Sequence, residues 1–386
     1  MRAVRLPMFQ YQLNHRFFAQ VPERIESFAS QELRELGAER VQPSYRGVYF
    51  DAGNAGLYRI NYAARLTTRV LAPLITFRCH SSDTLYKRSK EIAWQEFFSA
   101  DRTFAVFANV THSKIHHSQY AALRLKDAVV DSFRERVGRR PSVKRIDPDV
   151  WIGLYIERDN ATLSLDTSGG SLHRRGYREQ GSQAPMQEIT AAAMIRLSEW
   201  DGTRPLYDLM CGSGTLLTEA LMSHCRIPGS YLRKRFGFQC LPDYDKGLWL
   251  AEKQKLDGAM REPPYGLISG SDLSGDAVVS AKRNLRDLPY GDRVTLKVAD
   301  FRSITELRDR VILCNPPYGI RLEQDRDLGP FYRDLGDFLK RRCQGASAFV
   351  YFGNREWIGH VELKPTWKKA LKSGGLDGRL VKYDIY

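Results

Sequence analysis

From residue 187 onward, segments with helical periodicity alternate with short apolar runs that are typical of β-strands. The helical segments are 187–199, 214–224 and 275–287, and the apolar runs are 204–210, 266–273, 293–301 and 311–315. This alternation predicts an α/β domain with a doubly wound, mostly parallel sheet. Such a sheet binds its ligand beyond the carboxyl ends of its strands, so the residues that follow each strand are the first candidates for function.

Two smaller α+β units precede this domain. The first, within residues 15–75, has strand-like runs at 15–21 and 48–52, an amphipathic helix from Pro22 to Gly37 and a helical stretch at 58–66. The second has a strand at 103–110, a helix at 119–136 and strands at 150–158 and 161–168, with a two-residue turn signal at Asp159–Asn160. A basic stretch rich in glycine and serine then leads into the α/β domain.

The chain contains 59 lysine and arginine residues against 45 acidic ones, a formal charge of +14 at pH 7. An excess of this size favours a polyanionic partner, nucleic acid before an anionic membrane surface. No apolar run approaches the roughly 18–20 residues of a membrane span, and the N-terminus lacks the apolar core of a secretory signal. The six cysteines are widely spaced, which argues against a zinc site or a disulfide framework. We therefore expect a cytoplasmic protein without a metal site.

The motif DLMCGSGT (208–215) joins the end of the first apolar strand to the start of a helix. Its two glycines allow a tight turn and let a ligand approach the backbone closely. Phosphate-binding loops have a longer glycine pattern, which is missing here. A short turn with an acid at the strand end therefore favours a cationic or neutral nucleoside ligand, although a plain strand–helix turn remains the alternative.

Two further acids follow the next two strands. Asp272 can accept hydrogen bonds from both ribose hydroxyls of a nucleoside, as acids at this position do in dinucleotide folds. Asp300 can accept from an adenine amino group, with Phe301 beside the ring. Each acid alone is more often a helix cap, but three strand ends in order, each with an acid, favour a nucleoside site.

The motif NPPYG (315–319) follows the apolar strand that ends at Cys314. Its two prolines remove backbone donors, so the turn offers carbonyl groups without competing N–H groups. The Asn315 side-chain oxygen and a proline carbonyl can accept both protons of a planar exocyclic amine, while Tyr318 stacks on the base. Together with a nucleoside pocket, these features predict a methyltransferase that uses the electrophilic methyl of S-adenosylmethionine and relies on positioning, without a metal.

These motifs resemble those of class I S-adenosylmethionine-dependent RNA methyltransferases that modify the guanine N2 amine. The similar segments are DLMCGSGTLLTEA (208–220), GSDLSGDAVVSAKRNL (270–285), VADF (298–301) and CNPPYG (314–319). Upstream, RTFAVFANV and IDPDVWIGLYIERDNATLSLD are similar to a THUMP domain. The resemblance is greatest to the 23S ribosomal RNA guanine-N2 methyltransferase family, in its version with a single methyltransferase domain.

The resemblance implies three domains: a ferredoxin-like domain (1–75), a THUMP domain (76–167), and a linker with a Rossmann-like methyltransferase domain (168–386) that closes on an antiparallel hairpin at 372–386. It assigns the target amine to Asn315, Pro316, Pro317 and Tyr318. It assigns S-adenosylmethionine to Pro185, Glu188, Asp208, Met210, Cys211, Gly212, Ser213, Gly214, Thr215, Asp272, Leu273, Asp300, Phe301 and Asn315. Gln187 stands where many relatives have lysine, so this position is given no role.

Basic residues in the second unit and in the linker are candidates for RNA contacts. They are Lys114, Arg124, Lys126, Arg174, Arg175 and Arg178, with Tyr177 as a residue on which a base can stack. A solvated basic surface is the alternative. Arg233, Lys234 and Arg235 lie in a long insertion between the first two strands of the α/β domain, where an RNA contact is a further hypothesis.

Three functions follow from these observations. The first is guanine-N2 methylation of structured RNA, with 23S ribosomal RNA expected and tRNA as an alternative substrate. The second is adenine-N6 methylation of DNA, since the NPPY arrangement suits any planar amine. The third is RNA binding without catalysis. The modified nucleotide and the oligomeric state do not follow from the sequence.

Overall fold

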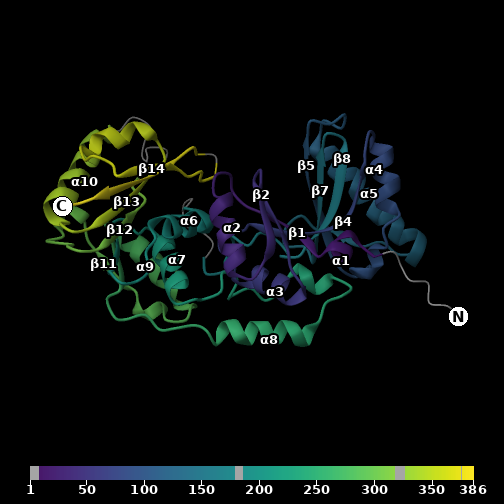
Figure 1. Ribbon diagram of the computed structural model, residues 1–386, viewed down its shortest axis with the longest axis horizontal. Helices are drawn as coiled ribbons and strands as arrows, with labels where there is room; N and C mark the ends of the chain where they lie inside the picture. Colours follow the sequence, from purple (N-terminus) through teal and green to yellow (C-terminus); the bar gives the residue numbers. More distant parts are fainter. Residues whose placement is uncertain (1–7, 179–185, 318–326, 375) are drawn as a thin grey trace. The chain divides into compact units, whose positions relative to one another are not determined.

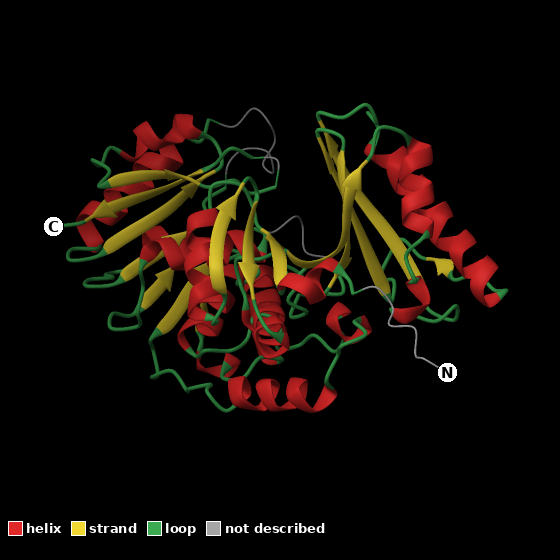
Figure 2. Cartoon of the chain, turned by 45° about the vertical axis from the view of Figure 1, so that its right-hand side comes forward, coloured by secondary structure: helices red, strands yellow, loops and turns green. Residues whose placement is uncertain are grey.

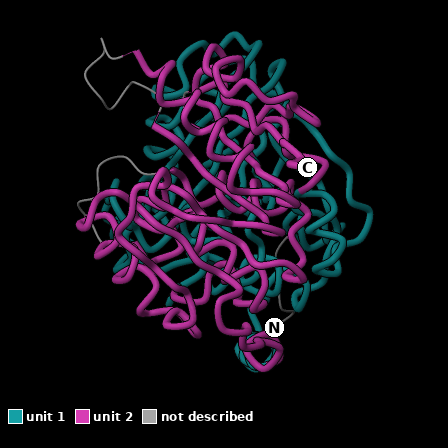
Figure 3. The backbone as a smooth tube through the Cα atoms, turned by 90° about the vertical axis from the view of Figure 1, so that its left-hand side faces the viewer, with its two compact units in different colours: residues 1–21, 29–172, 233–254 teal, residues 22–28, 173–232, 255–386 magenta. Residues whose placement is uncertain are grey.

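The computed structural model describes residues 8–178, 186–317, 327–374 and 376–386 (Figure 1). The chain divides into two compact units, which Figure 3 shows in different colours. Unit 1 comprises residues 1–21, 29–172 and 233–254, and unit 2 comprises residues 22–28, 173–232 and 255–386.

The strands of unit 1 form one sheet, in the order β2-β3-β1-β4-β8-β7-β5-β6. They are β1 (Arg16–Gln20), β2 (Glu39–Ser44), β3 (Gly47–Asp51), β4 (Arg69–Arg78), β5 (Thr103–Thr111), β6 (Ser142–Val143), β7 (Val150–Glu157) and β8 (Asn160–Asp166). The antiparallel pairing of β4 with β8, from Leu71 opposite Asp166 to Arg78 opposite Asn160, joins the two predicted α+β units. The two predicted units therefore share a continuous sheet.

The helices of this part of the chain are α1 (Gln10–Asn14), α2 (Glu26–Glu35), α3 (Asn54–Ala63), α4 (Ser82–Lys90), η1 (Trp94–Glu96), α5 (Ser118–Val137), η2 (Gly237–Cys240) and α8 (Lys246–Asp257). The prediction that a helix starts at Pro22 is wrong. Arg24 has φ +76°, a left-handed conformation that an α-helix cannot contain, so α2 begins at Glu26. The helix stops before Gly37, φ +85°, which is the terminating glycine that the sequence predicts.

The turn between β7 and β8 is also displaced from its predicted position. Glu157 pairs with Asn160, so the two loop residues are Arg158 and Asp159 and not Asp159 and Asn160. Both have positive φ, +47° and +60°, as a type I′ hairpin turn requires. The pair lacks the asparagine and glycine that usually mark this turn, which explains why the sequence located it one residue late.

The insertion that follows α7 (Thr215–His224) of unit 2 contributes residues 233–254 to unit 1. Arg233 donates hydrogen bonds to the carbonyls of Ser168, Gly169 and Ser171 at 2.7–3.3 Å. Arg235 pairs with Asp149 at 2.7 Å. Two of the three basic residues proposed for RNA contact therefore have partners within unit 1.

An aromatic cluster anchors the same insertion in unit 1. Trp249 of α8 is buried and meets the rings of Tyr62 and Phe238 edge-on, with centroids 5.3 and 5.1 Å apart. Phe238 in turn packs on Tyr58 at 4.6 Å. Because buried aromatic side chains carry large apolar areas, this cluster contributes strongly to the stability of unit 1.

The strands of unit 2 form a second sheet, in the order β11-β10-β9-β12-β13-β15-β14. They are β9 (Leu206–Asp208), β10 (Ile268–Asp272), β11 (Thr295–Val298), β12 (Val311–Cys314), β13 (Ser347–Phe352), β14 (Trp367–Ala370) and β15 (Arg379–Asp384). The first five pair in parallel, and β15 pairs antiparallel with β13 and β14. The predicted α/β fold is confirmed. The closing hairpin starts at Trp367, earlier than residue 372.

Helices lie on both sides of this sheet (Figure 2). They are α6 (Glu188–Ser198), α7, α9 (Gly275–Arg286) and α10 (Gly329–Arg342), with short 3₁₀ segments η3 (Gly291–Arg293), η4 (Phe301–Ser303) and η5 (Arg355–Val361). Leu335 and Leu339 of α10 pack on Ile312 and Val350 in the core of the sheet. None of the described helices is long and apolar enough to cross a membrane.

We predict that Trp249→Ala destabilises the protein by about 3–5 kcal/mol, because it removes a buried aromatic ring from a packed cluster. Leu250 on the same helix is 51% exposed, so Leu250→Ala serves as the control and is expected to change the unfolding free energy by less than about 0.5 kcal/mol. Urea denaturation of both variants measures the difference. Equal losses would mean that α8 is not anchored through Trp249.

Candidate active site

The strand order of unit 2 reverses between β9 and β12. Asp208, the last residue of β9, pairs with Gly270 of β10 on one side and with Leu313 of β12 on the other. Asp272 and Asn315 each lie two residues further along these neighbouring strands. Asp272, predicted to bind the ribose, and Asn315, predicted to hold the target amine, therefore flank the turn that follows Asp208. This is the edge where such sheets bind ligands. We call Asn315, Pro316 and Pro317 the amine clamp.

The turn after β9 has the backbone that its glycines allow. Gly212 and Gly214 have φ of +52° and +79°. A side chain at Gly214 would lie 2.9 Å from the Ala281 Cβ, so this glycine permits close packing of α7 on α9. A Cβ at Gly212 would meet no described atom within 4 Å. Gly212 therefore leaves its backbone open to a ligand, while Gly214 has a packing role.

The Asp272 carboxylate is fixed against this turn. One oxygen accepts the N–H of Gly212 at 2.8 Å, and the other accepts the N–H of Ser274 at 2.9 Å. Each oxygen keeps a second lone pair, which a ribose hydroxyl can use. Leu273, the next residue, is 72% exposed and offers an apolar surface beside the carboxylate. Both features fit a nucleoside.

Asp208 is buried, and its carboxylate accepts the N–H of Met210 at 3.1 Å. Burial raises the pKa of Asp208 to about 8, and the nearby charge of Asp272 contributes to the rise, while the Met210 hydrogen bond opposes it. A buried acid with such a pKa is poised to ionise when a cation binds beside it. This property suits a cofactor that carries a sulfonium and an ammonium group.

The Asp300 site differs in part from the prediction. The carboxylate accepts the N–H of Arg302 at 2.9 Å and forms an ion pair with its guanidinium at 3.1 Å. Phe301 is only 4% exposed, and its ring meets Phe331 and Phe338 edge-on. The Phe301 ring therefore packs in the core of unit 2, and its contact with an adenine stays a prediction.

The NPPY turn supplies an unpaired acceptor. The side-chain oxygen of Asn315 is buried and has no hydrogen-bond partner among the described residues. The Tyr332 hydroxyl of α10 donates to the Pro317 carbonyl at 3.0 Å and ties the turn to the helix. One lone pair of the Pro317 carbonyl is thus engaged by Tyr332, and we take the Pro316 carbonyl as the candidate for the second acceptor. Tyr318 lies outside the described residues.

Glu188, Arg178 and Thr215 lie together near the start of α7. Arg178 donates to Thr215 Oγ1 at 3.1 Å and to the Met186 carbonyl at 2.9 Å. Its guanidinium lies 3.5 Å from the Glu188 carboxylate, whose pKa is raised by burial. Arg178 therefore links two predicted cofactor residues, although the sequence assigned it to RNA.

The remaining candidates lie in or before this turn, and their contact with the cofactor stays a prediction. Met210 and Ser213 are half-buried, and the Ser213 carbonyl accepts from Asn284 at 2.9 Å. Cys211 is buried, and burial raises the pKa of its thiol, which fits an apolar role and not a nucleophile. Pro185 lies outside the described residues.

Arg175 corrects the predicted RNA contact most clearly. Its side chain is almost fully buried and pairs with the equally buried Glu219 of α7 at 3.1 Å. Tyr177 is also buried and donates to the same carboxylate at 3.4 Å. Neither side chain can reach a phosphate or a base from this position. Arg174 is exposed and stays a candidate.

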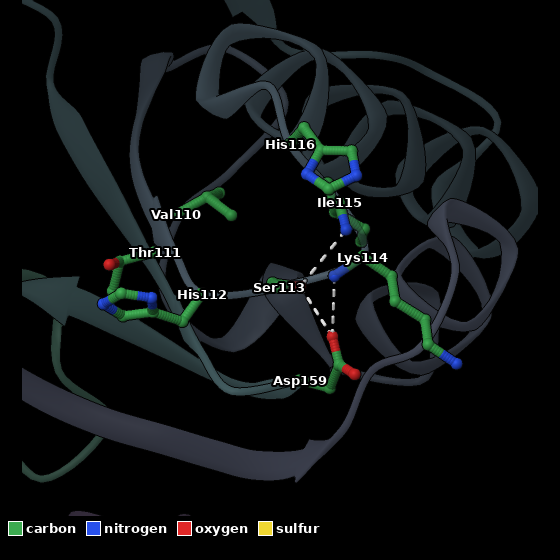
Figure 4. Close-up of a pocket in the computed structure, with 8 residues that line it drawn as sticks. All are labelled: Val110, Thr111, His112, Ser113, Lys114, Ile115, His116 and Asp159. Atoms are coloured by element: carbon green, nitrogen blue, oxygen red, sulfur yellow. Dashed lines mark hydrogen bonds between the residues drawn. The ribbon is translucent and has the colours of Figure 1, made fainter.

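The candidates in unit 1 lie on or beside α5. Arg124 pairs with Asp83 and lies over the Tyr86 ring, and Lys126 pairs with Asp127. Lys114 lines a hollow of about 460 Å³ formed by the loop after β5 (Figure 4).

Within that hollow, the Asp159 carboxylate accepts from the Ser113 hydroxyl and from the Lys114 backbone, whereas the Lys114 ammonium extends away from it. The ammonium is thus exposed for an RNA contact. Among the described residues, no group of three His, Cys, Asp or Glu side chains is arranged to hold a metal ion.

Comparison with known proteins identifies the family. Residues 175–382 match the RMKL-like methyltransferase domain, residues 79–166 match the THUMP domain, and residues 16–71 match the RlmL ferredoxin-like domain. The chain belongs to the RMKL-like methyltransferase family. It is therefore an S-adenosylmethionine-dependent methyltransferase, which confirms the reaction type and the cofactor predicted from the motifs.

Two curated relatives illustrate the similarity. The putative RNA methyltransferase slr0064 of Synechocystis is 38% identical, and the match covers 96% of this chain and 97% of that protein. The ribosomal RNA large subunit methyltransferase K/L of Syntrophotalea carbinolica is 37% identical over 96% of this chain. The match covers 53% of that protein, so the chain spans about half the length of the K/L relatives.

Solved structures agree with this fold over the whole chain. The putative methyltransferase SMU.472, crystallised with SAH, has a TM-score of 0.84 and 26% identity, and the match covers 97% of this chain and 98% of that one. A predicted N6-adenine-specific DNA methylase from Listeria monocytogenes gives the same TM-score and identity, with 97% of each chain covered.

The residues at the edge of β9, β10 and β12 fit S-adenosylmethionine. Asp208 can balance its positive charge, Gly212 leaves space along the backbone, and Asp272 has acceptors for ribose hydroxyls. Sequence reasoning missed Tyr332 and Glu219. Helical periodicity places both on buried helix faces, but no pattern indicates which partner a buried hydroxyl or carboxylate will have.

We predict that the contribution of Asp208 to the stability of the cofactor-free protein falls as pH rises between about pH 5 and about pH 8, because native Asp208 keeps a proton that the unfolded chain releases. The slope from this one group reaches at most about 1.4 kcal/mol per pH unit. Asp208→Asn removes that contribution and flattens the dependence. Urea denaturation across this range compares the two proteins, and parallel curves would contradict the shifted pKa.

Proposed function

We propose that this chain transfers the methyl group of S-adenosylmethionine to the exocyclic N2 amine of a guanine in structured RNA, with 23S ribosomal RNA as its substrate. The observation that carries the proposal is the buried side-chain oxygen of Asn315, which has no hydrogen-bond partner within the part of the chain that the structure describes and lies beside the turn after Asp208. An unsatisfied buried acceptor is costly, so its presence is best explained by a donor that the substrate brings.

The chain's own residues position this amine. Asn315 Oδ1 and the Pro316 carbonyl accept its two N–H groups, which withdraws the nitrogen lone pair from the ring and directs it toward the cofactor side of the sheet edge. S-adenosylmethionine supplies an electrophilic methyl group. The nitrogen–carbon bond forms as the sulfur–carbon bond breaks, and the amine then loses one proton to water. Tyr332 holds the Pro317 carbonyl and keeps the turn in place.

This proposal includes the site roles of Asn315, Pro316, Asp208, Gly212, Asp272 and Asp300, and it places Pro317 and Tyr318 beside the target base. It also includes a division into three domains with boundaries at residues 75 and 167. The family matches at 16–71, 79–166 and 175–382 support such a division. We further propose that the protein acts in the cytoplasm, where ribosomal RNA is found.

Ribosomal RNA is favoured over other substrates by the relatives. Several proteins named ribosomal RNA large subunit methyltransferase K/L are 32–37% identical to this chain over about 96% of its length. The THUMP match and the formal charge of +14 are also consistent with a structured RNA. tRNA is the second candidate, and the similarity to TrmN from Thermus thermophilus, at 17% identity and a TM-score of 0.68, concerns the fold alone.

Adenine-N6 methylation of DNA is a separate candidate, since an adenine amine also fits two acceptors. The Listeria monocytogenes protein, which is described as an N6-adenine-specific DNA methylase, is the relative that favours this candidate. Incubation with labelled S-adenosylmethionine and protein-free 23S ribosomal RNA, tRNA or duplex DNA separates the candidates. We expect label in N2-methylguanosine of 23S ribosomal RNA. Label in DNA alone would overturn the proposal, and an absence of cofactor binding in calorimetry would favour a protein that only binds RNA.

We predict that Asn315→Ala lowers kcat by about 10²–10³-fold, because it removes one of the acceptors aligned with the reacting amine. The affinities for S-adenosylmethionine and for RNA are expected to change by less than about threefold, since neither depends on this one contact. Single-turnover methylation and calorimetry measure the two effects. Equal losses in catalysis and in both affinities would mean that Asn315 maintains the fold instead.

A further inference from the structure

A second feature lies at the same edge of the unit 2 sheet. Arg379, the first residue of β15, pairs with Phe352 at the end of β13. Val350 of β13 pairs with Cys314 of β12. Phe352 lies two residues beyond Val350, just as Pro316 lies two residues beyond Cys314, so Phe352 is level with the NPPY turn. Because neighbouring strands are about 4.8 Å apart, Arg379 lies roughly 10 Å from that turn across the sheet.

Basic side chains line a hollow of about 390 Å³ at this position. Its described lining contains three cations, Arg355, Lys368 and Arg379, and no carboxylate. Ile358, Leu363 and Pro365 complete it with apolar surface. A lining that combines cations with an apolar floor fits a nucleotide, whose phosphate is anionic and whose sugar and base have apolar faces, better than it fits an inorganic anion.

Asp377 holds two of these cations in place without neutralising them. Its carboxylate pairs with Arg379 at 2.9 Å and with Arg355 at 3.1 Å, and also with Arg24 at 3.3 Å. The Arg379 hydrogen bond is the largest cause of the lowered pKa of Asp377, so the carboxylate stays ionised. Three guanidinium groups share one carboxylate, and positive charge remains for an external anion.

The hollow is connected to the amine clamp through η5. Trp357 stacks on Tyr332 with nearly parallel rings whose centroids are 5.7 Å apart, and Tyr332 donates to the Pro317 carbonyl. Ile358, the next residue after Trp357, lines the hollow. One short packed segment therefore positions both the turn that would hold the target base and the cationic hollow.

We propose that Arg355, Lys368 and Arg379 form an anchor for phosphate groups of the RNA strand next to the target guanine. The anchor rests on the proposed function. Enzymes that modify a base must take it out of the stack, so the neighbouring backbone has to be held while the base is displaced. A separation of roughly 10 Å across the sheet is within reach of nucleotides that neighbour the target, so the anchored phosphates would belong to the strand that carries it.

The test removes the two exposed cations of the anchor together, as Arg355→Ala/Lys368→Ala. Asp377 keeps Arg24 and Arg379 as partners in this variant, so no acid is left unpaired. The matched control is Lys340→Ala/Arg341→Ala. These two exposed residues lie in the last turn of α10, which leads into the start of β13, and so they lie toward the opposite end of the sheet's parallel strands.

Binding of a fluorescein-labelled single-stranded RNA to the full chain is followed by anisotropy over a range of salt concentrations. The anchor variant is expected to bind this RNA at least about tenfold more weakly near 0.1 M salt. The slope of log affinity against log salt concentration is expected to be shallower by about 1.4, which is the value for two lost phosphate contacts with a single strand. The control is expected to match the wild type. Calorimetry is expected to give unchanged S-adenosylmethionine affinity for both variants.

Methylation of protein-free 23S ribosomal RNA separates this proposal from the proposed function. With the function intact, the anchor variant raises KM for RNA and retains kcat at saturating RNA. If the wild type methylates no RNA but the anchor variant alone loses RNA affinity, the proposed function is wrong, and the three cations bind RNA phosphates without a target guanine beside them. Equal RNA affinity and salt dependence in the anchor variant and the control would overturn the anchor, as would RNA-independent binding of anionic lipid vesicles that the same variant abolishes.

Discussion

The catalytic half of this protein depends on the register of three parallel strands. Asp208 on β9 is paired with Gly270 on one side and with Leu313 on the other. The proposed ligand-binding groups at this sheet edge lie within a few residues of these three paired positions. The register brings Asp272 against the Gly212 amide and brings Asn315 to the adjacent strand end. A shift of either neighbouring strand by one residue would exchange its faces and separate the acid from the clamp.

Two polar groups of the site are buried near these paired positions. The Asp208 carboxyl group is desolvated, and the Asn315 oxygen has no partner among the described residues. Both are unfavourable in the free protein, and under the proposed function both would become favourable when the cationic cofactor and the target amine bind. The glycine turn complements them, because Gly212 presents backbone without a side chain. Under the proposed function, the site would gain its ligand selectivity from polar groups that lack partners among the described residues.

The sequence predicted the parallel sheet, the acids at its strand ends and the NPPY turn, because each is encoded by local patterns of apolar residues, glycine and proline. It did not predict that Arg175 is buried. A run of arginines before a helix indicates a basic surface, and only tertiary packing shows that Glu219, on a helix more than forty residues later, draws one of them into the core. The burial of the Phe301 ring could not be predicted for the same reason, since its edge contacts with Phe331 and Phe338 are distant in sequence.

The buried Arg175–Glu219 pair has a consequence for how the linker is understood. Removing one partner of such a pair leaves an uncompensated charge and costs about 3–5 kcal/mol, so the segment that contains Arg175 and Arg178 is firmly attached to α7. Arg178 extends this attachment to Thr215, at the start of α7, and to Glu188 on α6. Residues 173–178 of the linker therefore belong to unit 2, and any RNA contact made by unit 2 would come from exposed cations outside such buried pairs, such as Arg174 and Lys368.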